Sequence, residues 1–174
     1  PSWLQLMHSG WEEQWKHLQD PVFRQKLLQE EPVHLGDFEA FVTQSYDKMY
    51  LLADGYEPEA DASIAALAKA RGREPAELAM EVLMGEEGNG KLYFPLFNYS
   101  NNNLNALEEL HRSPWTRMGL SDAGAHCGAV CDGGMPTFML THWTRDRSRG
   151  PRLPLEYVIR RQTSETAASF GLMD

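Results

Sequence analysis

The sequence predicts an α/β fold, and three observations support this expectation. Residues 91–99, Lys-Leu-Tyr-Phe-Pro-Leu-Phe-Asn-Tyr, are apolar on both faces of an extended chain, as in a buried central strand. Leu104, Leu107 and Leu110 then follow a helical spacing, and residues 115–121 form a second strand-like run. A strand, a helix and a strand within about thirty residues predict a βαβ unit with parallel strands and a right-handed crossover.

The first 90 residues predict a helix-rich segment with one or two strands. Ser9 and Glu12 have the spacing of a capping box, which predicts that a helix begins there. Asp20 followed by Pro21 predicts the N-cap and the first helical position of a second helix.

Further along this segment, residues 38–46 are rich in aromatic and β-branched side chains and predict a strand, although their alternation is imperfect. Ser63 then predicts the N-cap of a helix that Gly72 closes. Pro75 begins another predicted helix, which ends in the Gly-rich residues 85–90.

In the rest of the chain the βαβ unit leads into a Gly-rich loop, and Pro136 begins a helix after it. Residues 154–162 and 164–170 predict two closing helices. We therefore expect two parts, a helix-rich segment at 1–90 and a βαβα segment at 91–174.

The Gly-rich loop within residues 118–136 carries the most reactive side chains of the sequence. Asp122 ends the predicted strand, and His126, Cys127 and Cys131 follow it. Glycines permit positive φ and close backbone approach, so such a loop can fold tightly around a small ligand or ion. The alternative is an ordinary strand-to-helix turn in which Asp122 caps the helix.

Residues 120–126, Leu-Ser-Asp-Ala-Gly-Ala-His, and residues 151–172 resemble, in this order, the last barrel segment of the amidohydrolase superfamily, nearest its D-aminoacylase (N-acyl-D-amino-acid deacylase) branch. The resemblance implies the last strands and helices of a (β/α)8 TIM barrel, placed after a helix-rich upstream insertion. It also implies one or two metal ions, commonly zinc. Asp122 matches the residue that binds the metal and shuttles a proton from the metal-bound water, at a strand end where barrel active sites assemble.

The activity that the resemblance implies is hydrolysis of the C–N bond of an amide, with an N-acyl D-amino acid as the expected small-molecule substrate. D-aminoacylases follow their Asp-Gly with a His-Pro-Arg element, whereas residues 123–127 are Ala-Gly-Ala-His-Cys. His126 either contacts the substrate or the oxyanion, or is a loop histidine bonded to backbone. The competing hypothesis for the whole chain is a non-catalytic protein-interaction or assembly module.

Most of the metal ligands that the superfamily uses have no counterpart here. The HxH pair is absent, and no residue corresponds to the bridging ligand or to the two later histidines. Since catalytic zinc takes three protein ligands plus water, Asp122 alone is insufficient. We expect a fragment of a longer enzyme that is inactive alone and binds little or no zinc. We also expect it to form a homodimer or to pair with the missing part of the barrel, because an incomplete barrel exposes strand edges.

Composition limits the partners and the compartment. A net charge of -9 and a pI near 5.1 argue against nucleic acid and anionic membrane surfaces. Cys127 and Cys131 provide only half of a structural zinc pattern and no disulfide framework, so we expect them to be inert thiols in a cytoplasmic protein.

Overall fold

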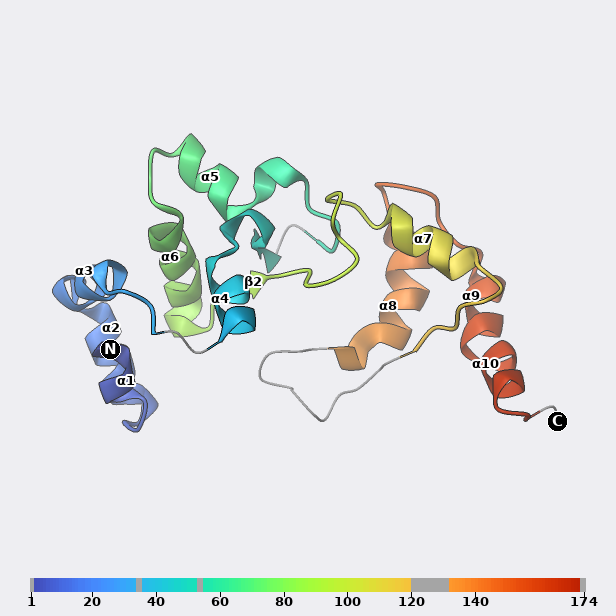
Figure 1. The fold of residues 1–174 in the computed structure, drawn as a ribbon, viewed down its shortest axis with the longest axis horizontal. Coiled ribbons are helices and arrows are strands. Elements are labelled where there is room, and N and C mark those ends of the chain that lie inside the picture. The colour runs from blue at the N-terminus through green and yellow to red at the C-terminus, as the bar shows by residue number, and fades with distance from the viewer. Residues whose placement is uncertain (1, 34–35, 53–54, 120–131, 173–174) are drawn as a thin grey trace. The chain divides into compact units, whose positions relative to one another are not determined.

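The computed structural model describes residues 2–33, 36–52, 55–119 and 132–172. The chain forms two compact units, Pro1–Asn102 and Asn103–Asp174, which we call unit 1 and unit 2 (Figure 1). Among the described residues of both units, no helix is long and apolar enough to cross a membrane.

Unit 1 begins with three short helices, and sequence-encoded caps explain the third. Asp20 is the N-cap of α3, where its side chain accepts a hydrogen bond from Val22 N at 2.9 Å, and Pro21 occupies the first turn, as predicted. The predicted capping box at Ser9 is wrong, because Gly10 is the N-cap of α2 and makes no side-chain cap bond. The three helices are α1 Ser2–Leu6, α2 Trp11–Gln19 and α3 Pro21–Gln29.

The rest of unit 1 contains three further α-helices, two 3₁₀ turns and a short sheet among its described residues. Ser63 caps α5 as predicted, since its hydroxyl accepts from Ala66 N at 3.2 Å. The α6 helix begins at Pro75, also as predicted. The elements are α4 Asp37–Gln44, η1 Tyr46–Lys48, β1 Tyr50–Leu51, η3 Ala60–Ala62, α5 Ile64–Ala70, α6 Pro75–Gly88 and β2 Leu92–Tyr93.

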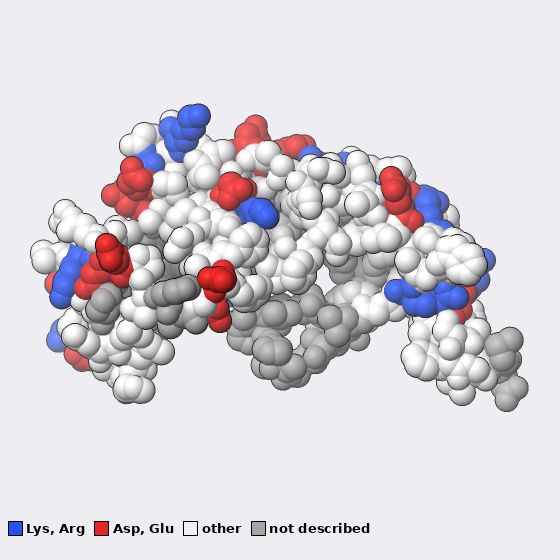
Figure 2. Space-filling model, viewed as in Figure 1, with Lys and Arg blue, Asp and Glu red and all other residues white. Residues whose placement is uncertain are grey.

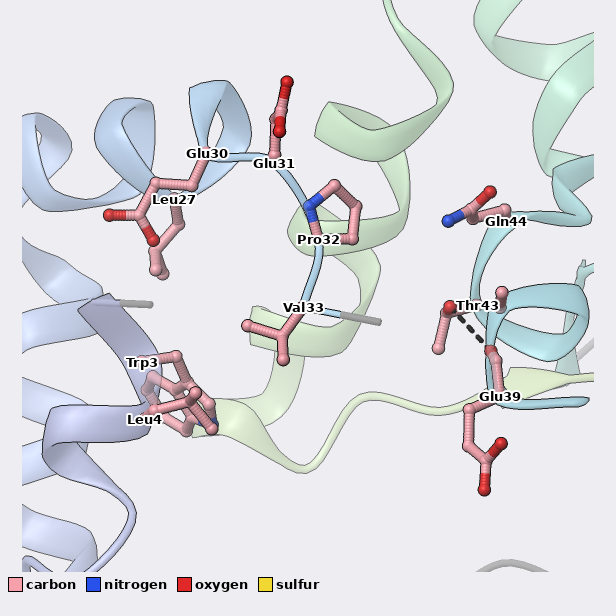
Figure 3. A pocket seen from close by; sticks show the side chains of 11 residues that line it. Trp3, Leu4, Leu27, Glu30, Glu31, Pro32, Val33, Glu39, Thr43 and Gln44 are labelled. Carbon is pink, nitrogen blue, oxygen red and sulfur yellow. Dashed lines mark hydrogen bonds between the residues drawn. The ribbon is translucent and has the colours of Figure 1, made fainter. Parts of the chain in front are cut away.

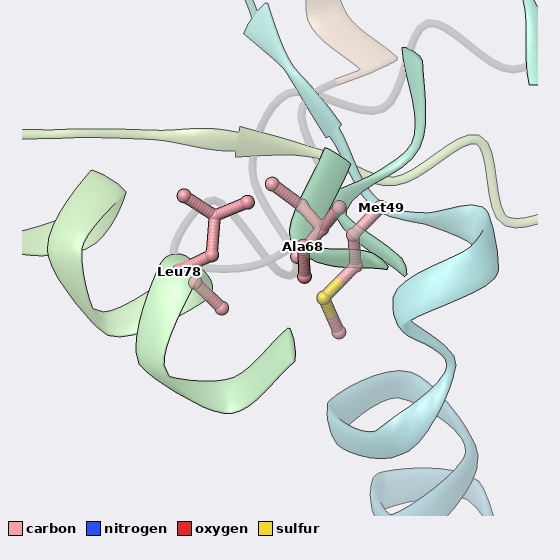
Figure 4. Packing of buried hydrophobic residues seen from close by; sticks show 5 residues of the cluster. Met49, Ala68 and Leu78 are labelled. Carbon is pink, nitrogen blue, oxygen red and sulfur yellow. The ribbon is translucent and has the colours of Figure 1, made fainter. Parts of the chain in front are cut away.

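The core of unit 1 lies between α5, α6 and the residue that precedes β1. Ile64 and Ala68 are fully buried on one face of α5, and Leu78 of α6 is 2 % exposed. Figure 4 shows Leu78 and Met49 on either side of Ala68. Burial of aliphatic side chains from both helices is the main source of stability here.

The α6 helix ends in a left-handed turn that contacts α2. Glu86, Glu87 and Gly88 have φ of 51°, 59° and 85°. A Cβ on Gly88 would lie 2.6 Å from the Trp11 ring and 3.1 Å from the Trp15 ring. These two rings stack with their centroids 5.7 Å apart. Glycine at position 88 is therefore required by both its conformation and its neighbours.

The regular elements of unit 2 among its described residues are all helices. Pro136 lies in the first turn of α8, as predicted, and α8 continues into a π-helical turn, η5. The elements are α7 Asn105–Arg112, η4 Asp132–Gly134, α8 Met135–Thr141, η5 His142–Asp146, α9 Leu155–Gln162 and α10 Ser164–Ser169.

The expected α/β fold with a partial (β/α)8 TIM barrel is wrong. In the described residues helices predominate, and the sheet consists of β1 and β2, which pair antiparallel with Tyr50 opposite Tyr93. The predicted strand at 91–99 therefore shrinks to two residues. Pro95 has no N–H to donate to a ladder, and Asn98 at φ 61° turns the chain out of the extended conformation.

Two other predicted strands do not form. Most of residues 38–46 belong to the helix α4, in which Phe38 and Phe41 are three positions apart and Phe41 packs edge-on against Phe94 with ring centroids 5.8 Å apart. Residues 115–119 are irregular. Their backbone accepts hydrogen bonds from side chains, and no strand pairs with it among the described residues. Arg117 donates to the carbonyl oxygens of Pro114 and Thr116 at 2.9 and 2.7 Å.

Candidate functional site

The residues predicted to carry the chemistry lie outside the described residues. These are Asp122, His126, Cys127 and Cys131, so their predicted roles stay predictions. The structure does describe the chain on either side, up to Gly119 and from Asp132 onward. The candidate site is therefore built from the groups that hold these two flanks.

The flank before the segment is held by a buried arginine of α9. Arg161 is 2 % exposed and donates through Nη2 to the carbonyl oxygen and the hydroxyl of Thr116 at 2.8 and 3.0 Å. The Thr116 hydroxyl in turn donates to the carbonyl of Ser113 at 3.2 Å. Because charged donors make stronger hydrogen bonds than neutral ones, this contact fixes the irregular stretch that leads to residue 120.

The flank after the segment is held by the next residue of the same helix. Gln162 donates through Nε2 to the carbonyl oxygen of Pro136 at 3.3 Å. Pro136 lies in the first turn of α8, so this hydrogen bond connects α9 to the start of α8. Consecutive side chains of α9 thus bind both flanks of residues 120–131.

A carboxylate orients the arginine from the following helix. Glu165 accepts from Arg161 Nη1 at 3.0 Å and from the more exposed Arg160 Nε at 2.9 Å. Burial alone would raise the pKa of Glu165, but hydrogen bonds from the two guanidinium groups outweigh it and place the pKa below its usual value. Glu165 is therefore a carboxylate at neutral pH and supports the position of Arg161.

An aromatic and cationic cluster forms the interior of unit 2. Trp143 is fully buried, and the His111 ring meets it edge-on with centroids 4.7 Å apart. The Arg147 guanidinium lies 4.6 Å from the centroid of the Trp143 ring, within cation–π distance. Arg147 also donates to Asn105 Oδ1 at 2.8 Å and to the carbonyl of Pro151 at 2.9 Å.

His111 is held neutral by these surroundings. Burial lowers its pKa to about 4, with smaller contributions from the positive charges of Arg161 and Arg147, and Glu108 opposes the shift. An imidazole with this pKa is not protonated at pH 7 and has little basicity. His111 therefore packs within the unit and is a poor candidate for a general base.

Two buried donors of this interior, Trp143 Nε1 and Arg161 Nε, have no hydrogen-bond partner among the described residues. A metal ion requires about three His, Cys, Asp or Glu side chains close together, and the described residues contain no such group. The described residues thus do not fit the zinc that the resemblance implies. Asp122, the one expected ligand, lies outside them.

Unit 1 contains a hollow of about 530 Å³ beside α3 and α4, drawn in Figure 3. Trp3 and Glu39 contribute to its lining, and Thr43 donates its hydroxyl to the carbonyl of Glu39 at 2.8 Å. Hydrogen bonds from Ser2 lower the pKa of Glu30, another lining residue, to about 2. The described lining contains no histidine, cysteine or lysine, and the Thr43 hydroxyl donates to a backbone carbonyl, so this hollow gives no sign of an activated nucleophile.

Surface charge is distributed over both units. Figure 2 shows Lys and Arg side chains next to Asp and Glu side chains on the face in view. Some charged residues four positions apart form ion pairs, including Arg73 with Glu77 at 3.7 Å and Arg112 with Glu108. Such exposed pairs each contribute less than about 1 kcal/mol.

Sequence reasoning missed Arg161 as the residue that organises unit 2. A signal was present, because Val158 and Arg161 are three residues apart and share the buried face of α9. Arginine is rarely buried without a partner, so its place on an apolar face indicates an internal contact.

No known protein family, curated protein or solved structure matches the chain.

Proposed function

We propose that this chain is part of an amidohydrolase that cleaves the C–N bond of a small amide, with an N-acyl amino acid as the substrate class. Asp122 is the proposed catalytic residue, and His126 is the proposed substrate contact. One structural observation supports the proposal. Thr116 and Pro136, which lie on either side of the segment that contains Asp122, are both bonded by the helix that resembles the D-aminoacylase closing motif, through Arg161 and Gln162.

The chemistry assigned to Asp122 is proton transfer. Water attacks the amide carbonyl carbon and the Asp122 carboxylate accepts its proton. The C–N bond then breaks, and Asp122 returns the proton to the departing amine. Zinc belongs to the proposal as the Lewis acid that activates water. Asp122 would be one of its ligands, and the described residues form no group of three that could hold the ion.

The test uses the complete product of the gene that encodes this chain. Hydrolysis of a panel of N-acetyl D- and L-amino acids is measured together with zinc content. Asp122→Asn should lower kcat/KM about 100-fold or more, since a carboxamide cannot move the proton. Asp61→Asn, on η3 of unit 1, is the control and should retain activity. Residues 1–174 alone should be inactive and low in zinc.

Two results would overturn this proposal. One is a complete gene product that binds zinc and hydrolyses none of the panel. The other is an Asp122→Asn variant as active as the parent protein. Stoichiometric zinc and hydrolysis in a monomer of residues 1–174 would show that the site lies wholly within this sequence.

A non-catalytic protein-interaction module is the second candidate, and exposed apolar side chains in unit 2 favour it. Trp115 is 92 % exposed and Phe170 is 79 % exposed. Exposed aromatic residues of this size often lie at interaction surfaces. Sedimentation velocity of the chain and of Trp115→Ser tests this candidate. A dimer that dissociates in the variant, together with an inactive complete gene product, would favour it.

A further inference from the structure

A second hollow of unit 1, of about 350 Å³, lies where η1 and β1 meet residues 95–102. Its size is within the usual range for small-ligand pockets, about 300 to 1,000 Å³. Two buried aromatic residues line it, Tyr50 and Tyr99, whose rings meet edge-on with centroids 6.3 Å apart. Their hydroxyls donate to Asn102 Oδ1 at 2.9 Å and to the carbonyl of Pro58 at 2.7 Å. We call these two rings the aromatic wall of the hollow, and the hydrogen bond of each hydroxyl holds its ring in place.

The polar lining is dominated by hydroxyl and carboxamide groups. Ser63, Asn98, Ser100 and Asn102 contribute them. Each of these groups can both donate and accept hydrogen bonds. Asn98 and Asn102 have φ of 61° and 52°, a left-handed conformation that costs energy and is found at ligand-binding loops. The two carboxamides are thus held on a loop of fixed shape beside the aromatic wall.

Charges in the described lining cancel. Asp47 and Lys48 contribute one charge of each sign and are adjacent on η1. The Lys48 ammonium lies 4.8 Å from the centroid of the Phe41 ring, and Phe41 is not a lining residue. The hollow therefore has no excess charge to attract an anion or a cation.

An aromatic residue of the same loop completes the hollow. Phe97 lines it and remains 73 % exposed, so a bound molecule would shield an apolar ring from water. We propose that this hollow binds a neutral polyhydroxylated ring of monosaccharide size. The C–H face of such a ring packs on Phe97, and its hydroxyls exchange hydrogen bonds with the carboxamide of Asn98 and the hydroxyl of Ser100. This binding does not depend on the proposed amidohydrolase function.

Saturation-transfer NMR and titration of the 174-residue chain test the proposal. The probes are glucose, galactose and N-acetylglucosamine, with benzoate and phenethylamine as charged aromatic controls. We expect at least one sugar to bind with a Kd on the order of 1–10 mM. Addition of 0.5 M NaCl should change this Kd less than about twofold, because salt screens only charged ligands.

Matched variants identify the hollow as the binding site. Phe97→Ala should weaken sugar binding about tenfold, since it removes the exposed ring. Asn98→Gly keeps the left-handed backbone, removes the carboxamide, and should weaken binding by several-fold. Phe170→Ala, at an equally exposed phenylalanine of unit 2, should have no effect. Circular dichroism confirms that the variants are folded.

The proposal is overturned if none of the sugars binds. It is equally overturned if benzoate or phenethylamine binds better than every sugar, or if folded Phe97→Ala and Asn98→Gly both bind sugar as the parent chain does.

Discussion

The guanidinium of Arg161 donates to both the backbone carbonyl and the side-chain hydroxyl of Thr116, a residue 45 positions earlier in the chain. One buried cation thereby joins α9 to the irregular stretch after α7. Its neighbour Arg160 is exposed and binds the same Glu165, so the two arginines are a natural comparison.

Arg161→Ala should lower the free energy of unfolding by about 2–4 kcal/mol, because it removes a buried charged donor from the Thr116 carbonyl and hydroxyl and from Glu165. Arg160→Ala should cost less than about 1 kcal/mol, as exposed ion pairs do. Urea unfolding followed by circular dichroism measures both. Equal losses in the two variants would contradict a special role for Arg161.

Acidification should destabilise unit 2 through His111. Its folded-state pKa of about 4 lies below the ordinary value of 6.5, so the unfolded chain binds the proton more readily. The stabilisation is complete above pH 6.5 and is lost progressively as the pH falls toward 4. Urea midpoints at pH 7.5 and 5.5 measure the loss. His111→Phe keeps an aromatic ring against Trp143, cannot titrate, and should flatten this dependence.

The half-exposed His17 of unit 1 provides the control for this pH effect. It pairs with Glu13 on α2, at 3.3 Å between Nε2 and Oε1. His17→Gln should retain the parent protein's loss of stability between pH 7.5 and 5.5. A parent-like pH dependence in His111→Phe would assign the effect to another group.

Gly88→Ala should destabilise unit 1 by about 1–2 kcal/mol, because a left-handed alanine is unfavourable and its methyl group must displace Trp11. Gly85→Ala is the control, since a Cβ at Gly85 meets no atom within 4 Å and its φ is -56°. Tryptophan fluorescence during urea unfolding reports both the loss and the changed ring environment. A Gly88→Ala variant as stable as Gly85→Ala would rule out this contact.

Leu78→Ala should lower the free energy of unfolding of unit 1 by about 2–5 kcal/mol, because it opens a cavity between α5 and α6. Leu83 is on the same helix and is 47 % exposed, so Leu83→Ala should cost much less. Thermal unfolding followed by circular dichroism compares them. Similar melting temperatures for the two variants would place the core elsewhere.

Local signals in the sequence predicted helix starts well. Asp20 and Ser63 cap α3 and α5, and Pro75 and Pro136 lie in the first turns of α6 and α8. These signals act within one turn of helix, where the side chain and the backbone it bonds are neighbours in sequence. They therefore do not depend on the tertiary structure.

Strand prediction failed because it depends on partners far along the chain. Residues 38–46 have high strand propensity, yet contacts such as Phe41 with Phe94 favour the helix α4. In 91–99, Pro95 limits the ladder to Leu92 and Tyr93. The candidate site was missed for the same reason. Arg161 is important because it bonds Thr116, and no local sequence pattern connects two residues 45 positions apart.

The contacts of Arg161 and Gln162 hold two points of the chain, Thr116 and Pro136, on the same helix α9. Once Thr116 and Pro136 are fixed on α9, the entropic cost of the connection grows only with the logarithm of its length, about 0.6 kcal/mol for each doubling. By this argument, we expect changes of length between these two points to cost the rest of unit 2 little stability. Under the proposed function, the chemistry assigned to Asp122 and His126 could therefore vary without changes to the contacts that α9 makes with Thr116 and Pro136.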